Sequence, residues 1–214
     1  MSTDFWPTLH SDPYALARLR KSCELLDAKP GMSVLDVGCH QGEARQFLKD
    51  VEYQGLDALT GHDIDGELDP GYGLGQWDRI LCLEVLEHLN YPRKTLASIA
   101  FHLKKDGVAV ISLPNEATLF HRLRSLLGVV DAECFSESGK HLHLPSLKQC
   151  VSFLESNLQI VSKHYYIAPT AAGSRQAWLG AILRIIPDSI HQLLADFFPS
   201  MFARGFIFVC KKMG

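Results

Sequence analysis

Glu84, Glu87 and His88 are three titratable residues within five positions of the sequence. Residues of these types at this spacing could act together in catalysis or in metal binding. If the segment is helical, spacings of three and four residues place all three side chains on one face. Two carboxylates and an imidazole could hold a divalent cation such as Mg²⁺, although nitrogen is not its preferred ligand atom. His88 could instead act as a general base, or Glu84 and His88 could only hydrogen-bond nearby loops. The sequence leaves these alternatives open.

His141 and His143 form a second group, just before a predicted helix. In an extended segment, alternate residues point to the same side, so both rings would lie together. No third metal ligand is evident in the sequence. We therefore favour local hydrogen bonding or the lining of a substrate pocket over a metal site, and His143 joins His88 as a candidate catalytic residue.

The segment from Val34 to Gly42 has the composition of a ligand-binding loop. A short apolar strand carries Asp36 near its end, and a turn with Gly38 and Gly42 follows. Glycines at such a turn let the backbone approach a ligand closely. A carboxylate beside the turn repels a pyrophosphate but attracts a ligand that carries an ammonium and a sulfonium. Because no Gly-Lys-Ser/Thr follows and the dinucleotide spacing is missing, the pattern favours S-adenosylmethionine (SAM) over ATP or NAD.

Alternating strand and helix patterns surround these candidates and predict one α/β domain over residues 1–214. We expect a doubly wound, Rossmann-like sheet with helices on both faces. Predicted strands cover residues 33–37, 51–56, 77–83, 108–113, 159–167 and 205–211. Predicted helices cover residues 12–26, within an amino-terminal helical cap of residues 1–29, and residues 43–48, 92–103 and 146–157. Residues 60–75 are expected to form a loop with at most a short strand, and residues 105–107 a turn.

The composition argues against several classes of protein. A net charge of −3 offers no basic stripe, so we expect no nucleic-acid partner. The six cysteines are scattered without a Cys-x-x-Cys pair, which argues against a zinc site or a disulfide scaffold. The sequence opens with no signal-peptide pattern, and no apolar run reaches transmembrane length. We therefore expect a cytoplasmic protein with reduced thiols.

Four motifs in register resemble those of class I SAM-dependent methyltransferases, in the broad group that includes the ubiquinone-biosynthesis O-methyltransferases. The matching segments are residues 36–42, residues 55–57, residues 76–81 with 84–89, and residues 103–107 with 113–115. The resemblance implies a seven-stranded, mostly parallel sheet whose last strand is antiparallel. By this resemblance, Glu84, Glu87 and His88 occupy the positions that some quinone O-methyltransferases use to place a catechol-like oxygen.

The resemblance further implies which residues bind SAM. The candidate cofactor-binding residues are Asp36, Gly38, Gly42, Asp57, Asp63, Glu67, Leu83 and Glu84. Asp36 and the two glycines would hold the methionine end. Asp57 would accept hydrogen bonds from both ribose hydroxyls, and either Asp63 or Glu67 would contact the adenine amine. Leu83 would pack near the sulfonium.

His40 departs from the family pattern, which usually has glycine at this position. Its side chain could crowd the methionine part of SAM or point outward. A non-catalytic SAM-fold partner that regulates another enzyme therefore stays open as an alternative. An NAD-dependent oxidoreductase is a remote one, because the loop spacing disfavours it. We expect methyl transfer from SAM to a small-molecule or lipid-like acceptor, with O-methylation favoured.

Residues 174–202 predict an apolar helical insertion between the last two strands. One helical face would comprise Trp178, Leu179, Ile182, Leu183 and Ile186, and after a break at Pro187-Asp188 the apolar surface continues with Leu193, Leu194, Phe197 and Phe198. We favour a lid over the acceptor pocket, which implies an apolar or amphipathic acceptor. Packing against the domain's own core, a homodimer or a peripheral membrane contact would use the same surface.

Overall fold

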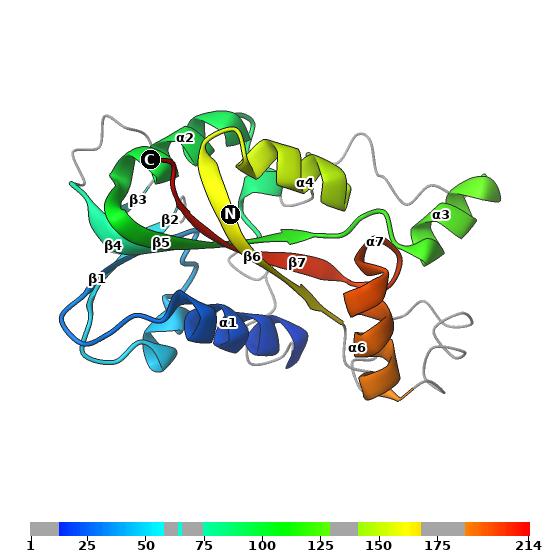
Figure 1. Ribbon diagram of the computed structural model, residues 1–214, viewed down its shortest axis with the longest axis horizontal. Helices are drawn as coiled ribbons and strands as arrows, with labels where there is room; N and C mark the ends of the chain where they lie inside the picture. The colour runs from blue at the N-terminus through cyan, green and yellow to red at the C-terminus, as the bar shows by residue number, and fades with distance from the viewer. Residues whose placement is uncertain (1–12, 58–63, 66–74, 129–140, 168–186) are drawn as a thin grey trace, which may run out of the picture.

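The computed structural model describes residues 13–57, 64–65, 75–128, 141–167 and 187–214 (Figure 1). The chain forms a mixed β-sheet in the order β3-β2-β1-β4-β5-β7-β6. Its strands are β1 (Ser33–Val37), β2 (Glu52–Asp57), β3 (Ile64–Asp65), β4 (Trp77–Leu83), β5 (Leu103–Pro114), β6 (Leu158–Tyr166) and β7 (Gly205–Lys212). The edge strand β3 contributes only two residues, paired with β2.

The strand directions bring the predicted site residues to one edge of the sheet. Strands β1 to β5 pair in parallel, whereas β7 is antiparallel to both β5 and β6. The predicted α/β class and the antiparallel final strand are therefore confirmed. The strand order reverses between β1 and β4, and open α/β sheets bind their ligands beyond the carboxyl ends of the strands at such a reversal.

Helices cover both faces of the sheet, as Figure 1 shows. On one face α1 (Pro13–Leu26) buries Leu19, Cys23 and Leu26 against the sheet. On the other face lie α2 (Pro92–His102) and α4 (Leu147–Leu154), whose apolar residues join a second buried cluster. The predicted doubly wound arrangement is confirmed. The five described cysteines are free and buried, as the prediction of reduced thiols requires.

A polar link joins the amino ends of three strands. Asp78 Oδ2 accepts hydrogen bonds from the amide and hydroxyl of Ser33, over 3.0 and 2.8 Å, and from Lys104 Nζ over 2.8 Å. These hydrogen bonds, with that from Lys104 the strongest, lower the pKa of Asp78 to about 2. Charged groups at this edge are thus paired within the protein, and they serve the fold.

Two local predictions need correction. The turn expected at residues 105–107 lies within β5, because Trp77 pairs with Leu103 and Arg79 with Val108, so the residues between bulge out of the ladder. Helix α4 keeps its predicted capping box but ends at Leu154, before the expected residue 157. The structure also contains α3 (Leu119–Leu126), which the sequence analysis did not predict.

The helices α3, α6 (Asp188–Phe197) and α7 (Pro199–Phe202) gather at one end of the molecule (Figure 1). Helices α6 and α7 form the second half of the predicted insertion. Its first half, residues 174–186 with Trp178, lies outside the described residues. Among the described helices, none is both long and apolar enough to span a membrane.

Candidate active site

The glycine loop leaves the carboxyl end of β1 and enters the 3-10 helix η3 (Glu43–Phe47). The amides of Gly38 and Cys39 donate to the Leu56 carbonyl over 2.7 and 3.3 Å. Gly38 has a φ of 74°, and a Cβ at this position would lie 2.2 Å from Val85 Cγ2. Both the backbone and the space therefore require glycine, which lets the loop pack against the segment after β4.

His40 adopts a φ of 48°, a left-handed conformation that glycine enters most easily. Its amide donates to Asp57 Oδ2 over 2.7 Å, and its ring Nδ1 lies 3.0 Å from Glu43 Oε1. The histidine thus adopts a backbone conformation that glycine enters more easily, and its ring is paired to η3.

Asp36 and Asp57 bring carboxylates to the same edge from β1 and β2. Asp36 is 5% exposed and accepts a 2.6 Å hydrogen bond from the Tyr53 hydroxyl. Burial raises the pKa of Asp36 to about 6 despite this hydrogen bond, and the charges of Glu43 and Asp57 act in the same direction. Several carboxylates around a buried position favour a positively charged ligand.

These features fit SAM. The Gly38 turn admits no side chain, the Asp36 carboxylate suits an ammonium group, and Asp57 can accept hydrogen bonds from hydroxyls. Leu83 ends β4 and is partly buried. Asp63 and Glu67 lie outside the described residues, so the contact to adenine stays a prediction.

Glu84 stands apart from Glu87 and His88, so the prediction that one helical face carries all three is wrong. Glu84 has a φ of 56°, and the short 3-10 helix η5 (Leu86–His88) begins only after it. A residue in the left-handed conformation interrupts the helical geometry on which the three-and-four spacing depends. The predicted metal ligands are therefore not brought together as one set.

The Glu84 carboxylate is held by side chains from three other elements. Its Oε1 accepts hydrogen bonds from Ser112 Oγ on β5 over 3.2 Å and from the Tyr166 hydroxyl on β6 over 3.1 Å. Its Oε2 lies 3.5 Å from Arg18 Nη1 on α1. The amino-terminal helix is thus tied directly to the end of β4.

Glu87 and His88 lie instead beside His141, with one ligand atom of each residue within 4.8 Å of the others. Glu87 Oε1 is 3.9 Å from His88 Nε2 and 4.0 Å from His141 Nε2. The two rings meet edge to face, with centroids 4.8 Å apart. The amides of Leu142 and His143 donate to the Glu87 carbonyl over 2.8 and 3.1 Å, which fixes the histidine segment against η5.

The electrostatics of this cluster are unusual. Glu87 is buried, and neither of its carboxylate oxygens has a hydrogen-bond partner among the described residues. Burial, followed by the charge of Glu84, raises the pKa of Glu87 well above its usual value. His141 Nδ1 donates to Glu116 Oε1 over 2.6 Å, and this lowers the pKa of Glu116. A neutral imidazole that donates from Nδ1 has an unprotonated Nε2, which can accept a proton or bind a metal.

His143, the other histidine of the pair, is exposed, and its Nε2 donates to the Leu89 carbonyl over 2.9 Å. The structure thus brings His141, rather than His143, beside His88. The sequence analysis missed the roles of Arg18, Glu116 and Tyr166. Their contacts join residues at least 25 positions apart in the chain, and no local sequence pattern predicts such contacts.

Comparisons with known proteins agree with this geometry. The profile of a methyltransferase domain family matches residues 9–163 of the chain. The chain is 26% identical, over 157 residues, to a ubiquinone biosynthesis O-methyltransferase of Burkholderia pseudomallei. The match covers 64% of each protein, so the chain spans just under two thirds of the length of the curated relatives it matches.

Solved structures share the fold at low sequence identity. The N-methyltransferase NodS from Bradyrhizobium japonicum WM9, in complex with S-adenosyl-L-homocysteine (SAH), is 14% identical with a TM-score of 0.58, over 100% of this chain and 94% of that one. The cyclopropane synthase MmaA2 from Mycobacterium tuberculosis is 16% identical with a TM-score of 0.58, over 92% and 84%. The profile match leads to one assignment, with which the glycine loop and the shared fold agree: the chain belongs to the methyltransferase domain family.

Proposed function

We propose that the protein transfers the methyl group of SAM to a hydroxyl oxygen of a small-molecule acceptor. The observation that carries this proposal is the cluster of Glu87, His88 and His141 at the edge that also holds the glycine loop. Methyl transfer to a hydroxyl forms an oxygen–carbon bond and releases the hydroxyl proton, so a proton acceptor must lie nearby. SAM supplies a methyl group already activated by its sulfonium, which leaves positioning and proton removal to the protein.

His141 is the better oriented proton acceptor of the two histidines in the cluster. Its Nδ1 donates to Glu116, which orients the ring and leaves Nε2 as the nitrogen that can take up a proton. His88 lies against it and could take the same role or hold the acceptor. The O-methyltransferase name of the 26% identical relatives supports oxygen as the receiving atom.

A second candidate role for the same cluster is a divalent cation site, favoured by the buried Glu87 carboxylate. A buried carboxylate without hydrogen bonds is stable only if it takes up a proton or is neutralised by a cation. Two imidazoles and one carboxylate suit Mn²⁺, Fe²⁺ or Zn²⁺ better than Mg²⁺, which prefers oxygen ligands. The cation would bind the acceptor oxygen and lower the pKa of its hydroxyl.

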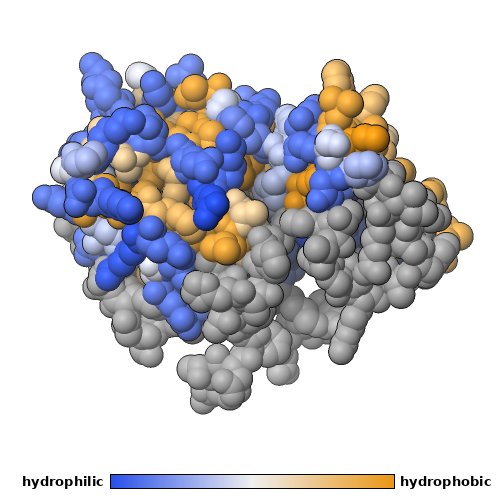
Figure 2. All heavy atoms as spheres, turned by 90° about the horizontal axis from the view of Figure 1, so that it is seen from below, coloured by the Kyte–Doolittle hydropathy of each residue, from blue (hydrophilic) through white to orange (hydrophobic). Residues whose placement is uncertain are grey.

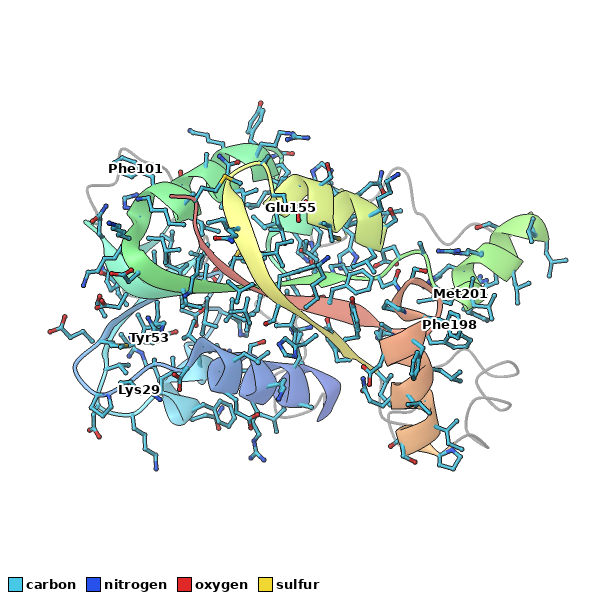
Figure 3. The ribbon with its side chains drawn as sticks, in the orientation of Figure 1. Lys29, Tyr53, Phe101, Glu155, Phe198 and Met201 are labelled. Carbon is cyan, nitrogen blue, oxygen red and sulfur yellow. The ribbon has the colours of Figure 1, made fainter. Side chains whose placement is uncertain are left out.

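The surface beside the site suggests an apolar acceptor. Leu193, Phe197 and Phe198 of the α6–α7 region are 54%, 71% and 55% exposed, so they are not packed into the domain's own core. Figure 3 shows Phe198 and Met201 close together where α6 meets α7, and Figure 2 shows hydrophobic residues at this end of the molecule. We propose that the insertion at residues 174–202 covers a lipid-like or amphipathic acceptor. A homodimer or a peripheral membrane contact would use the same surface.

The proposal is tested by binding and by turnover. Isothermal titration calorimetry with SAM, SAH and NAD in parallel should show binding of the first two only. The protein should then be incubated with SAM and a panel of phenols, quinone precursors and hydroxylated lipids, with SAH release as the measured product. Release with one class of hydroxylated acceptor supports the proposal. Binding of SAM without turnover on any of them would favour the non-catalytic partner, and binding of NAD alone an oxidoreductase.

The cation role has its own test. Elemental analysis of the purified protein should find close to one equivalent of a transition metal, and its removal by a chelator should abolish turnover. The variant Glu87→Gln should lose the metal, whereas Glu155→Gln, an exposed carboxylate at the end of α4, should keep it. Full turnover in excess chelator would leave proton acceptance as the role of the cluster.

A further inference from the structure

Tyr166 reaches Glu84 across β7 and β5, the two strands between β6 and β4. Its hydroxyl donates to Glu84 Oε1 over 3.1 Å, although Tyr166 is on β6 and Glu84 follows β4. The ring passes over Gly205, the first residue of β7, where an added Cβ would lie 2.2 Å from the Tyr166 hydroxyl oxygen. Any larger residue at Gly205 would push the hydroxyl away, so this glycine keeps the path to Glu84 clear.

The carboxylate of Glu84 is pulled in two directions. Ser112 and Tyr166 hold Oε1 with two hydroxyl groups, while Arg18 attracts Oε2 from the other side. The 3.5 Å separation from Arg18 is longer than a charge-assisted hydrogen bond, which is usually below 3 Å. The two hydrogen bonds at Oε1 limit how far the carboxylate can turn toward Arg18.

Both charged side chains are largely shielded from water. The Arg18 and Glu84 side chains are 15% and 16% exposed, so their mutual attraction is stronger than that of a surface pair. If the Tyr166 hydroxyl were removed, Ser112 alone would hold Oε1, and the carboxylate could turn to form a closer pair with Arg18. A closer pair would leave less negative charge for any other cation.

Glu84 also adjoins the glycine loop, since the next residue, Val85, packs directly on Gly38. The methyl donor carries a positive sulfonium and its demethylated product does not. A carboxylate at this edge therefore favours the donor over the product, provided that its charge is not already neutralised.

We propose that Tyr166 is a positioning residue, whose hydroxyl keeps the Glu84 carboxylate away from Arg18 and so preserves its charge for the binding of SAM. The inference rests on the proposed function, because it requires that SAM binds beside the glycine loop. Tyr166 itself touches neither substrate in this account. Its whole effect passes through Glu84.

The experiment is a double-mutant cycle read by calorimetry. Dissociation constants for SAM and for SAH are measured on the wild type, Tyr166→Phe, Glu84→Gln and the double variant. Each single variant should weaken SAM about 3- to 10-fold while changing SAH less than about 2-fold, the range expected for one partly screened charge interaction. The double variant should bind SAM no more weakly than Glu84→Gln, because the two residues act as one unit.

Two further variants sharpen the cycle. Adding Arg18→Gln to Tyr166→Phe should restore SAM affinity, because the Arg18 guanidinium that would pair with the carboxylate is then absent. Tyr165→Phe removes the hydroxyl of the adjacent residue and should bind SAM like the wild type. Thermal unfolding of each variant shows whether it remains folded, which the loss of a single hydroxyl should permit.

The outcomes separate this inference from the proposed function. If the wild type binds neither SAM nor SAH, the proposed function is wrong. If it binds both, but Tyr166→Phe leaves SAM unchanged or weakens SAM and SAH equally, Tyr166 does not act through the charge of Glu84. If the losses of SAM affinity in the two single variants multiply in the double variant, the inference is overturned. It is also overturned if adding Arg18→Gln does not restore the SAM affinity of Tyr166→Phe.

Discussion

The two ends of strands β1 and β4 each carry an aspartate, and the surroundings of these two aspartates differ in opposite ways. At the amino ends, Asp78 accepts three hydrogen bonds and the pKa falls to about 2. At the carboxyl end of β1, Asp36 is buried with one hydrogen bond, and the pKa rises to about 6. The fold therefore compensates the charge of Asp78 at one edge and leaves that of Asp36 under-compensated at the other.

This difference locates the chemistry. Glu87, also at the carboxyl edge, is buried without hydrogen bonds, and the pKa is again raised. Groups that a protein leaves under-compensated cost stability, and they are retained where a ligand completes them. Substitutions at the carboxyl edge should therefore affect function more than stability, and substitutions at the amino edge should do the reverse.

The largest expected effect lies in the histidine cluster. His141→Gln should lower turnover about 100-fold or more, the lower range for loss of a general base, because glutamine cannot take up the acceptor proton. The dissociation constant for SAH and the unfolding temperature should stay near the wild-type values. Turnover is measured as SAH release with the acceptor found in the screen.

Two other histidine variants serve as controls for this prediction. His164→Gln, on β6 with its ring beside Ser162, should retain full turnover. His143→Gln should cost less than His141→Gln, because the Nε2 of His143 is already engaged by the Leu89 carbonyl. A greater loss at His143 than at His141 would return the catalytic role to the residue that the sequence alone suggested.

The next effect concerns the donor. Asp57→Ala should weaken SAM binding about 30- to 100-fold, equivalent to about 2 to 3 kcal/mol for hydrogen bonds to a charged group. It also removes the acceptor of the His40 amide, which loosens the loop. Calorimetry with SAM provides the measurement, and Asp106→Ala, an exposed aspartate within the β5 bulge, is the control. Equal affinity for all three proteins would contradict the ribose contact.

The pH dependence of stability should have opposite signs at the two edges. The raised pKa of Asp36 means that its favourable contribution is present below about pH 4 and is lost as pH rises through about 6. Asp36→Asn should therefore stabilise the ligand-free protein at pH 8 by about 2 kcal/mol, while it weakens SAM binding.

Asp78 provides the matched case at the amino edge. Its lowered pKa contributes stability above about pH 4 that is lost as pH falls toward 2. Asp78→Asn should destabilise the protein by about 1 kcal/mol at pH 7, a discounted figure because its side chain is 29% exposed. Urea unfolding between pH 3 and 8 measures both variants. The same sign of effect at pH 8 for the two would remove the contrast between the edges.

The last expected effect distinguishes a steric clash at a glycine from the cost of its positive φ. Gly31 and Gly38 both have positive φ, 81° and 74°, but only at Gly38 would a Cβ meet another residue, Val85. Gly38→Ala should therefore cost about 1 to 2 kcal/mol more than Gly31→Ala in urea unfolding, the lower part of the range for overpacking. Adding Val85→Ala should recover that difference if the contact is its cause.

Local patterns carried most of the fold prediction. The boundaries of β1 and β4 match the prediction, because a short apolar run bounded by turn residues specifies a buried strand. The capping box before α4 was equally readable, since its two hydrogen bonds join residues three apart. Helix α3 was missed because it buries none of its residues, so no apolar stripe facing a core marks it.

The candidate site also has one part that depends on local sequence and one part that depends on long-range contacts. The proposed donor half depends on a loop of a few residues and one aspartate, and the sequence predicted their places after β1 and at the end of β2. The other half depends on contacts such as Glu87 with His141 and Glu84 with Tyr166, which only the folded sheet creates. The spacing of Glu84, Glu87 and His88 misled because it assumed a helix that begins two residues later in the structure.

The most direct test is a pair of crystal structures of the protein soaked with SAH and with NAD. The account predicts density for SAH over the glycine loop, with the Gly38 turn against the ligand and the Asp57 carboxylate on its ribose, and no density for NAD there. NAD in that place, or SAH bound away from Gly38 and Asp57, would contradict it.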